Sequence, residues 1–189
     1  MNPKPNSLAV ETVPDAGPIP TFDELASHAA DLSAALVARG WSLASAESCT
    51  GGLIGAVCTS LAGSSGWYER GFITYSNEAK IDSLGVEPTL IASHGAVSRE
   101  VAEAMAIGAL ARSKAHISVA VTGIAGPGGG TPDKPVGTVW IAAATGAPGT
   151  DAKVESQLLQ LDGDRSAVRA RTVQRALALL ASTATAVAS

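Results

Sequence analysis

Residues 41–61 read WSLASAESCTGGLIGAVCTSL, and in this stretch a strand-like run passes directly into a helix-like run. We predict a strand over residues 41–47 and a short helix over 51–61. Further strands are predicted at 70–75, 116–122, 137–144 and near 152–159, and further helices at 21–40, 78–84, from 88, at 98–113 and at 165–180. Such alternation favours a sheet covered by helices on both faces. The predicted fold is a single-domain α/β protein, a three-layer α/β/α sandwich with a mostly parallel or mixed sheet.

The predicted domain, residues 21–185, follows a proline-rich segment. Residues 1–20 contain five prolines and show no periodicity, so we expect a flexible tail without a regular element there. Thr21 and Glu24 then match a capping box, which marks the start of a helix. Its apolar residues recur at helical spacing: Leu25, Ala29, Leu32 and Leu36.

Composition excludes several classes of protein. The 189 residues include 13 Lys and Arg against 17 Asp and Glu, a net charge of -4, so we expect no nucleic-acid partner. No run approaches the roughly 18 apolar residues of a membrane helix, and the N-terminus lacks the order of a signal peptide. We therefore expect a cytoplasmic protein without a membrane partner.

The cysteines and histidines argue against stabilisation by disulfide bonds or by a bound metal ion. The two cysteines and three scattered histidines lack the spacing of a disulfide framework or a zinc site, so we expect no metal. Only 4% of the residues are aromatic although 46% are hydrophobic, which predicts a core of Ala, Val, Leu and Ile with close helix packing. The apolar composition also favours a homo-oligomer.

The first segment that could carry chemistry is AESCTGG, between the predicted strand and helix. Its small residues and glycines let a substrate approach the backbone. A reaction at the Ser48 hydroxyl could place an oxyanion beside the N–H groups of Thr50, Gly51 and Gly52. Alternatively, Ser48 or Thr50 only caps the helix.

The second segment is YSNEAK, at a predicted strand-to-helix transition. On one straight helix the side chains of Tyr75 and Lys80 would point about 140° apart, so they converge only if Tyr75 lies outside the helix. With Asn77 as the helix cap, Lys80 lies in the first turn, where the helix dipole disfavours a cation and lowers the lysine pKa. A lysine with a lowered pKa suits a proton acceptor. The alternative is a solvated lysine beside a half-buried tyrosine.

The third segment is TGIAGPGGG, directly after a predicted strand. It resembles a phosphate cradle but lacks the Gly-Lys-Ser/Thr ending of a P-loop. We expect Thr122, Gly123 and Gly126 to contribute to substrate binding, unless the segment is only a surface loop. Arg165 and Arg169 open the last predicted helix and could pair with a phosphate or a carboxylate, unless this face is only solvated. Arg165 is the residue expected to contact a phosphate.

In combination these motifs are specific. The chain resembles the CinA C-terminal domain family, in particular its stand-alone nicotinamide-nucleotide amidohydrolases, over about residues 22–185. The motifs that carry the resemblance are AESCTGGLIGA, GSSGWYERGFITYSNEAK, GAVSREVAEAMA, SVAVTGIAGPGGG with KPVGTVWIA, and LDGDRSAVR.

The resemblance implies hydrolysis of the carboxamide of nicotinamide mononucleotide to nicotinate mononucleotide and ammonia, a step of pyridine nucleotide salvage. It places the nucleophile on Ser48 and further catalytic residues on Tyr75 and Lys80. No histidine occurs in the three segments, so a Ser–Lys arrangement, with or without a relay through Tyr75, agrees with the assignment. This chemistry requires no metal or organic cofactor.

Two alternatives remain open at this stage. One is a non-catalytic nucleotide-binding or regulatory module of the same fold. The other is an amidase that uses Cys49, because a helix N-terminus lowers a thiol pKa, whereas a buried Cys49 would be inert.

Overall fold

The first helix forms where its capping box predicts it. The computed structural model describes residues 13–15, 17–146 and 152–186, and α1 spans Phe22–Ala38. The Thr21 hydroxyl accepts a hydrogen bond from the Glu24 N–H at 3.3 Å, and the Glu24 carboxylate accepts one from the Thr21 N–H at 2.7 Å. The four predicted apolar residues of α1 are all buried.

The strands form one mixed sheet in the order β1-β6-β5-β4-β2-β3. Neighbouring strands run parallel except at β5, which is antiparallel to both β4 and β6. The strands are β1 (Val13–Asp15), β2 (Leu43–Glu47), β3 (Tyr68–Ile73), β4 (Ile117–Gly123), β5 (Thr138–Thr145) and β6 (Lys153–Leu161). The remaining helices are α2 (Leu53–Thr59), α3 (Asn77–Leu84), α4 (Pro88–His94), α5 (Arg99–Ala111) and α6 (Arg165–Ala186), with a 3-10 turn at Ser64–Gly66.

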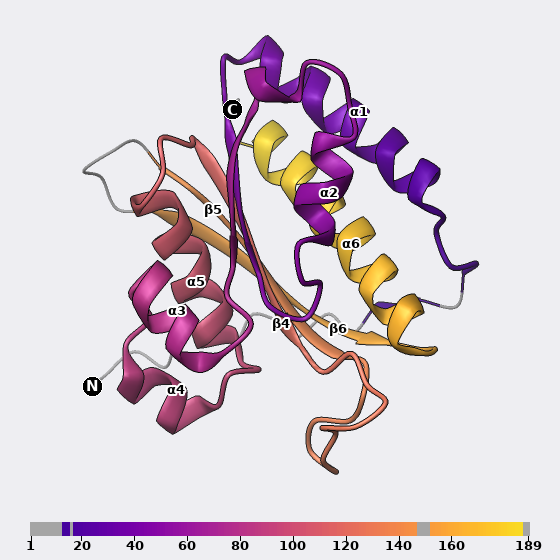
Figure 1. Ribbon diagram of the computed structural model, residues 1–189, viewed down its shortest axis with the longest axis vertical. Coiled ribbons are helices and arrows are strands. Elements are labelled where there is room, and N and C mark those ends of the chain that lie inside the picture. Colours follow the sequence, from indigo (N-terminus) through magenta and orange to yellow (C-terminus); the bar gives the residue numbers. More distant parts are fainter. Residues whose placement is uncertain (1–12, 16, 147–151, 187–189) are drawn as a thin grey trace, which may run out of the picture.

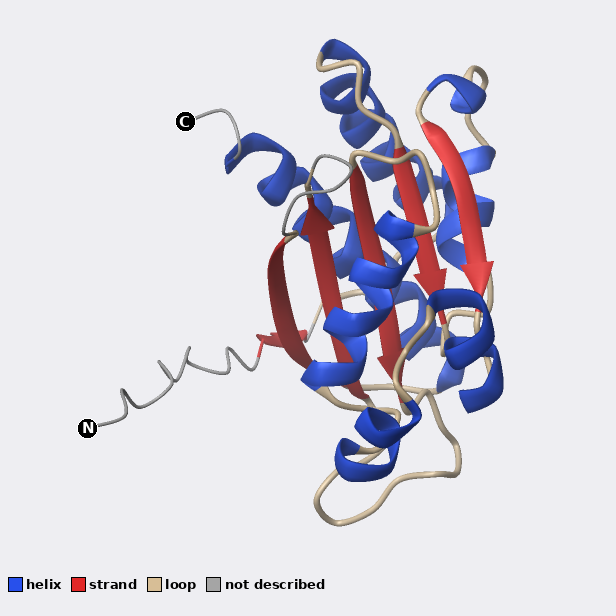
Figure 2. Ribbon diagram, turned by 90° about the vertical axis from the view of Figure 1, so that its left-hand side faces the viewer, coloured by secondary structure: helices blue, strands red, loops and turns tan. Residues whose placement is uncertain are grey.

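Helices cover both faces of this sheet, which confirms the predicted three-layer sandwich. Helices α1, α2 and α6 lie on one face and α3, α4 and α5 on the other (Figures 1 and 2). Each interface has its own buried cluster, and the one under α3–α5 is rich in alanine on the strand side: Ala44, Ala46, Ala120, Ala142 and Ala144. These small side chains let the helices pack closely on the sheet, as the composition predicts.

The prediction for the proline-rich segment is wrong at residues 13–15. These residues form β1, which pairs in parallel with β6, with Pro14 opposite Gln160. An edge strand tolerates proline because one side of its backbone needs no partner, and the pairing covers backbone groups of β6. The rest of the predicted tail up to residue 12, and residue 16, lie outside the described residues.

The carboxyl ends of three parallel strands meet at one edge of the sheet. Glu47, the last residue of β2, is in register with Ile73 of β3 and Val121 of β4. The three segments singled out in the sequence therefore begin side by side, and this edge is where open α/β sheets place their sites. None of the helices in the described part of the chain is long and apolar enough to cross a membrane.

Candidate functional site

Ser48 is the first residue after β2. Its N–H donates to the Val121 carbonyl at 3.0 Å, which continues the β2–β4 pairing by one residue. The side chain is not a helix cap: α2 begins at Leu53, and its N-cap is Gly52 in the left-handed region, without a side-chain cap. The capping alternative is therefore wrong, and the Ser48 hydroxyl makes a different contact.

That contact is with Lys80, whose Nζ lies 3.1 Å from Ser48 Oγ. The lysine side chain is 1% exposed, and its Nζ also donates to the carbonyls of Thr74 at 2.9 Å and Ser76 at 3.4 Å. Burial lowers the pKa of Lys80, because removal from water disfavours the charged form. The alternative of a solvated lysine is wrong.

The three contacts suit an ammonium, which donates three hydrogens, and they also allow a neutral amine. A neutral Nζ carries two hydrogens and one lone pair. The two hydrogens can donate to the carbonyls of Thr74 and Ser76, which leaves the lone pair for the hydroxyl hydrogen of Ser48. The arrangement can therefore remove a proton from Ser48 as the oxygen attacks a carbonyl carbon.

Helix α3 places Lys80, although its cap differs from the prediction. Ser76, not Asn77, is the N-cap, and its hydroxyl accepts a hydrogen bond from the Ala79 N–H at 3.0 Å. Ser76 is the cap because it directly precedes the first helical residue, Asn77, and has an extended backbone. Its hydroxyl can therefore reach the N–H groups of the first turn. Leu84, one turn after Lys80, lies on the same buried side of α3.

Cys49 follows Ser48 in the chain but is buried. Its side chain is 6% exposed, and burial raises the pKa of its thiol to about 12. A thiol with this pKa is protonated at neutral pH, and the thiol form is a poor nucleophile. The structure thus favours the inert alternative for Cys49 over the cysteine amidase.

Tyr75 does not join the Ser48–Lys80 pair as a hydrogen-bonded relay. The residue lies outside α3 as expected, but it is 59% exposed, and its hydroxyl accepts a hydrogen bond from Arg165 Nη2 at 2.8 Å. The side chains of Tyr75 and Lys80 diverge because Lys80 turns inward to the strand ends. The same Arg165 donates from Nη1 to the Gly126 carbonyl at 3.0 Å, so one guanidinium joins the second and third segments.

A cavity of about 280 Å³ lies beside this guanidinium. It is lined by residues 125–127 of the glycine-rich loop, by Val136 and by residues 163–166 at the start of α6. Gly126 and Arg165, for which the sequence analysis predicts substrate binding, both line this cavity. The loop itself projects from the sheet edge between β4 and β5 (Figure 1).

The contacts of Thr122 and Gly123 are with the protein itself. Thr122 is 1% exposed, and its hydroxyl donates to the Ala96 carbonyl at 2.7 Å. A Cβ on Gly123 would lie 2.6 Å from a methyl group of Val139, so glycine is needed for close packing on β5. These two residues hold the base of the loop.

The turn after Ser48 differs from the expected oxyanion site. The Gly51 N–H donates to the Ser48 carbonyl at 3.1 Å and the Gly52 N–H to the Glu47 carboxylate at 3.0 Å. The Thr50 hydroxyl also donates to Glu47, at 2.7 Å. The expectation that Gly51 and Gly52 offer free donors is wrong in this structure, because the chain itself uses them.

Two residues hold this turn: Glu47, whose role the sequence analysis did not predict, and Arg169, which it placed at the start of the last helix without this contact. Glu47 is 1% exposed, and its carboxylate binds the turn from within the protein. Arg169 reaches it from α6 and donates to the Thr50 carbonyl at 2.7 Å from Nη2. An acidic residue at the end of a buried strand, a few residues before a helix, was the available signal, since carboxylates are favoured at helix N-termini.

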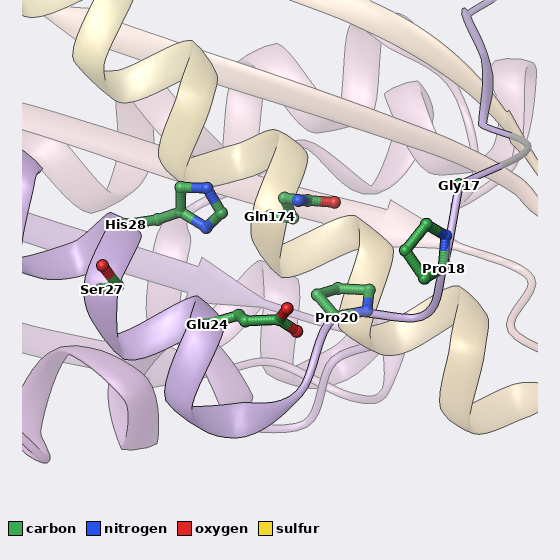
Figure 3. Close-up of a pocket in the computed structure, with 7 residues that line it drawn as sticks. All are labelled: Gly17, Pro18, Pro20, Glu24, Ser27, His28 and Gln174. Carbon is green, nitrogen blue, oxygen red and sulfur yellow. The ribbon is translucent and has the colours of Figure 1, made fainter.

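A second cavity, of about 380 Å³, is lined by residues of α1, of α6 and of the segment before α1. Glu24, Ser27 and His28 of α1, Gln174 of α6 and residues of the preceding segment line it (Figure 3). Across the described ranges no cluster of three or more His, Cys, Asp or Glu could hold a metal ion.

The fold and the site define an α/β protein with a buried serine–lysine pair at the carboxyl ends of its parallel strands. The chain belongs to the CinA C-terminal domain family, whose sequence model matches residues 25–184.

This chain covers nearly all of one relative and only part of another. The chain is 48% identical over 160 residues to the nicotinamide-nucleotide amidohydrolase PncC of Escherichia coli K12, covering 85% of this chain and 94% of that protein. It is 50% identical over 159 residues to a CinA-like protein of Mycolicibacterium paratuberculosis, but that match spans only 36% of the longer relative.

Solved structures agree with the fold. A competence/damage inducible protein from Agrobacterium tumefaciens is 42% identical with a TM-score of 0.77, covering 87% of this chain and 96% of that one. A CinA superfamily protein from Klebsiella pneumoniae is 37% identical with a TM-score of 0.79, covering 88% and 99%.

Proposed function

We propose that the protein hydrolyses the carboxamide of nicotinamide mononucleotide to nicotinate mononucleotide and ammonia. The 3.1 Å contact between Ser48 Oγ and the buried Lys80 Nζ carries this proposal. It supplies a nucleophile with an adjacent base, which is what hydrolysis of an unactivated amide requires. The substrate class comes from the relatives named nicotinamide-nucleotide amidohydrolase.

In the proposed mechanism, Lys80 first accepts the proton of Ser48 and then donates it to the leaving group. Neutral Lys80 takes it as Ser48 Oγ bonds to the carboxamide carbon, and the resulting ammonium gives it to the amide nitrogen as the C–N bond breaks. Ammonia leaves, and an ester of nicotinate mononucleotide remains on Ser48. Lys80 then takes a proton from water as the water oxygen attacks the ester carbon. It returns this proton to Ser48 Oγ as the ester C–O bond breaks and nicotinate mononucleotide leaves.

Arg165 is the proposed contact for the nucleotide 5′-phosphate. Its guanidinium lies beside the cavity lined by residues 125–127 and 163–166, and arginine pairs strongly with phosphate. Tyr75, hydrogen-bonded to the same guanidinium, is then a binding residue at the rim of the site. Action in the cytoplasm and homo-oligomer formation remain predictions from the composition.

Ammonia release tests the proposal directly. We expect release from nicotinamide mononucleotide in preference to nicotinamide, its riboside and the dinucleotide. Ser48→Ala and Lys80→Ala should each lower turnover at least roughly 100-fold. No release from any of the four compounds would favour the non-catalytic module instead.

A further inference from the structure

The buried carboxylate of Glu47 stands directly before the nucleophile but on the opposite face of the sheet. Successive side chains of a strand alternate between faces. Accordingly, Glu47 contacts the start of α2, whereas Ser48 contacts Lys80 of α3. These two helices lie on opposite sides of the sheet (Figure 1).

Hydrogen bonds surround this carboxylate. Oε2 accepts from the Thr50 hydroxyl at 2.7 Å and from the N–H groups of Gly52 and Ile54 at 3.0 Å each. Oε1 accepts from the Gly55 N–H at 2.9 Å and the Ser45 hydroxyl at 3.4 Å. None of the ion pairs among the described residues includes Glu47. These five donors occupy both oxygens of the carboxyl group.

Four of the five bonded groups belong to the chain segment that follows Ser48. Glu47 precedes the serine, and Thr50, Gly52, Ile54 and Gly55 come after it, so one carboxylate fixes the chain on both sides of the nucleophile. Removal of the carboxylate would leave these buried donors without their acceptor, which costs more than the bonds contribute. The turn would then shift to recover partners.

We propose that Glu47 is a positioning residue that keeps Ser48 Oγ within hydrogen-bonding distance of Lys80 Nζ. The catalytic consequence rests on the proposed function, whereas the effect on Ser48 reactivity does not. Arg169 supports the same turn from outside by binding the Thr50 carbonyl.

Glu47→Gln tests this role with little change of shape. The amide offers one acceptor oxygen, and its NH2 group must face N–H donors on one side or the other. We expect kcat to fall at least roughly 10-fold with KM within about 3-fold, because small displacements of reacting groups cost rate more than binding. The acid limb of the kcat–pH profile, which reports Lys80, should stay in place.

A serine-directed fluorophosphonate probe gives a second readout that needs no substrate. Its rate of attachment to Ser48 should fall by a factor similar to kcat in Glu47→Gln. Thr50→Val, which removes one donor to the carboxylate, should slow attachment by about 3-fold, as expected for loss of one hydrogen bond. Thr59→Ala is the matched control, because Thr59 bonds the Gly55 carbonyl from the exposed end of α2 and should leave both rates unchanged.

The outcomes separate the two proposals. Unchanged attachment and kcat in Glu47→Gln would overturn the positioning role, as would a wild-type chain whose Ser48 is not labelled. If Glu47→Gln does not fold, an unchanged attachment rate in Thr50→Val overturns it. If the wild type is labelled but releases no ammonia, the proposed function fails, while slower labelling of Glu47→Gln still supports positioning.

Discussion

The contact between α3 and α5 offers a way to move Lys80 without changing it. Gly108 of α5 faces the end of α3, and a Cβ at this position would lie 2.2 Å from the Leu84 carbonyl oxygen. Ordinary contact begins at 3.4 Å, so Gly108→Ala forces this end of α3 outward by about 1.2 Å. The neighbour is backbone, which cannot turn aside as a flexible side chain would.

Lys80 lies one turn before Leu84, so the displacement carries it away from Ser48. A lengthening of the 3.1 Å Nζ–Oγ contact by most of an ångström takes it beyond hydrogen-bonding range. We expect kcat for ammonia release to fall roughly 10- to 100-fold, the scale of a misplacement of about 1 Å. Overpacking should cost about 1–3 kcal/mol in unfolding free energy, offset by up to about 1 kcal/mol from the helix propensity of alanine.

Steady-state ammonia assays and thermal unfolding check this expectation. A net loss of about 1–2 kcal/mol corresponds to a Tm decrease of about 2–8 °C for a chain of this size. Gly66→Ala is the matched control, because a Cβ there meets nothing within 4 Å, and it should change neither quantity. A Gly108→Ala protein with wild-type kcat would refute the claim that the spacing of α3 sets the position of the base.

Four further predictions follow from individual side chains. Because only neutral Lys80 accepts a proton and burial lowers its pKa, kcat should fall as the pH drops through that pKa; a pH-independent kcat down to pH 5 would contradict this. Since folded Lys80 binds a proton less readily than unfolded Lys80, wild-type stability should rise relative to Lys80→Met as the pH approaches 10.5, measured by urea unfolding; a constant difference would argue against it. Cys49→Ala should keep kcat within about 3-fold, because the buried thiol, with a pKa of about 12, is not the nucleophile; a 100-fold loss in the ammonia assay would restore the cysteine alternative. Tyr75→Phe, which removes a partner of Arg165, should raise KM by about 3- to 10-fold with little change in kcat, whereas a large kcat loss would restore the relay.

The sequence allowed the layers and most elements to be predicted because their signals are local. Alternating apolar runs, the Thr21 capping box and the glycines after helices depend only on near neighbours in the chain. Strand β1 could not be predicted, because its pairing with β6 joins segments about 146 residues apart and overrides a composition typical of a tail.

The sequence predicted which residues come together in the site, but it did not predict all of their contacts. Ser48 and Lys80 were expected together, and the register of β2 with β3 and β4 accounts for their approach. The internal use of the Gly52 N–H and the pairing of Tyr75 with Arg165 depend on side-chain directions that spacing does not contain. Glu47 escaped notice because a motif match names residues without showing which donors they bind.

The central claim is that Ser48 attacks the substrate after its proton passes to Lys80. Rapid acid quench during turnover of nicotinamide mononucleotide, followed by peptide mass spectrometry, tests it most directly. The account predicts an ester of nicotinate mononucleotide on the peptide that contains Ser48, and none in Lys80→Met. Sustained ammonia release with the adduct on Cys49, or an undiminished Ser48 adduct in Lys80→Met, would contradict it.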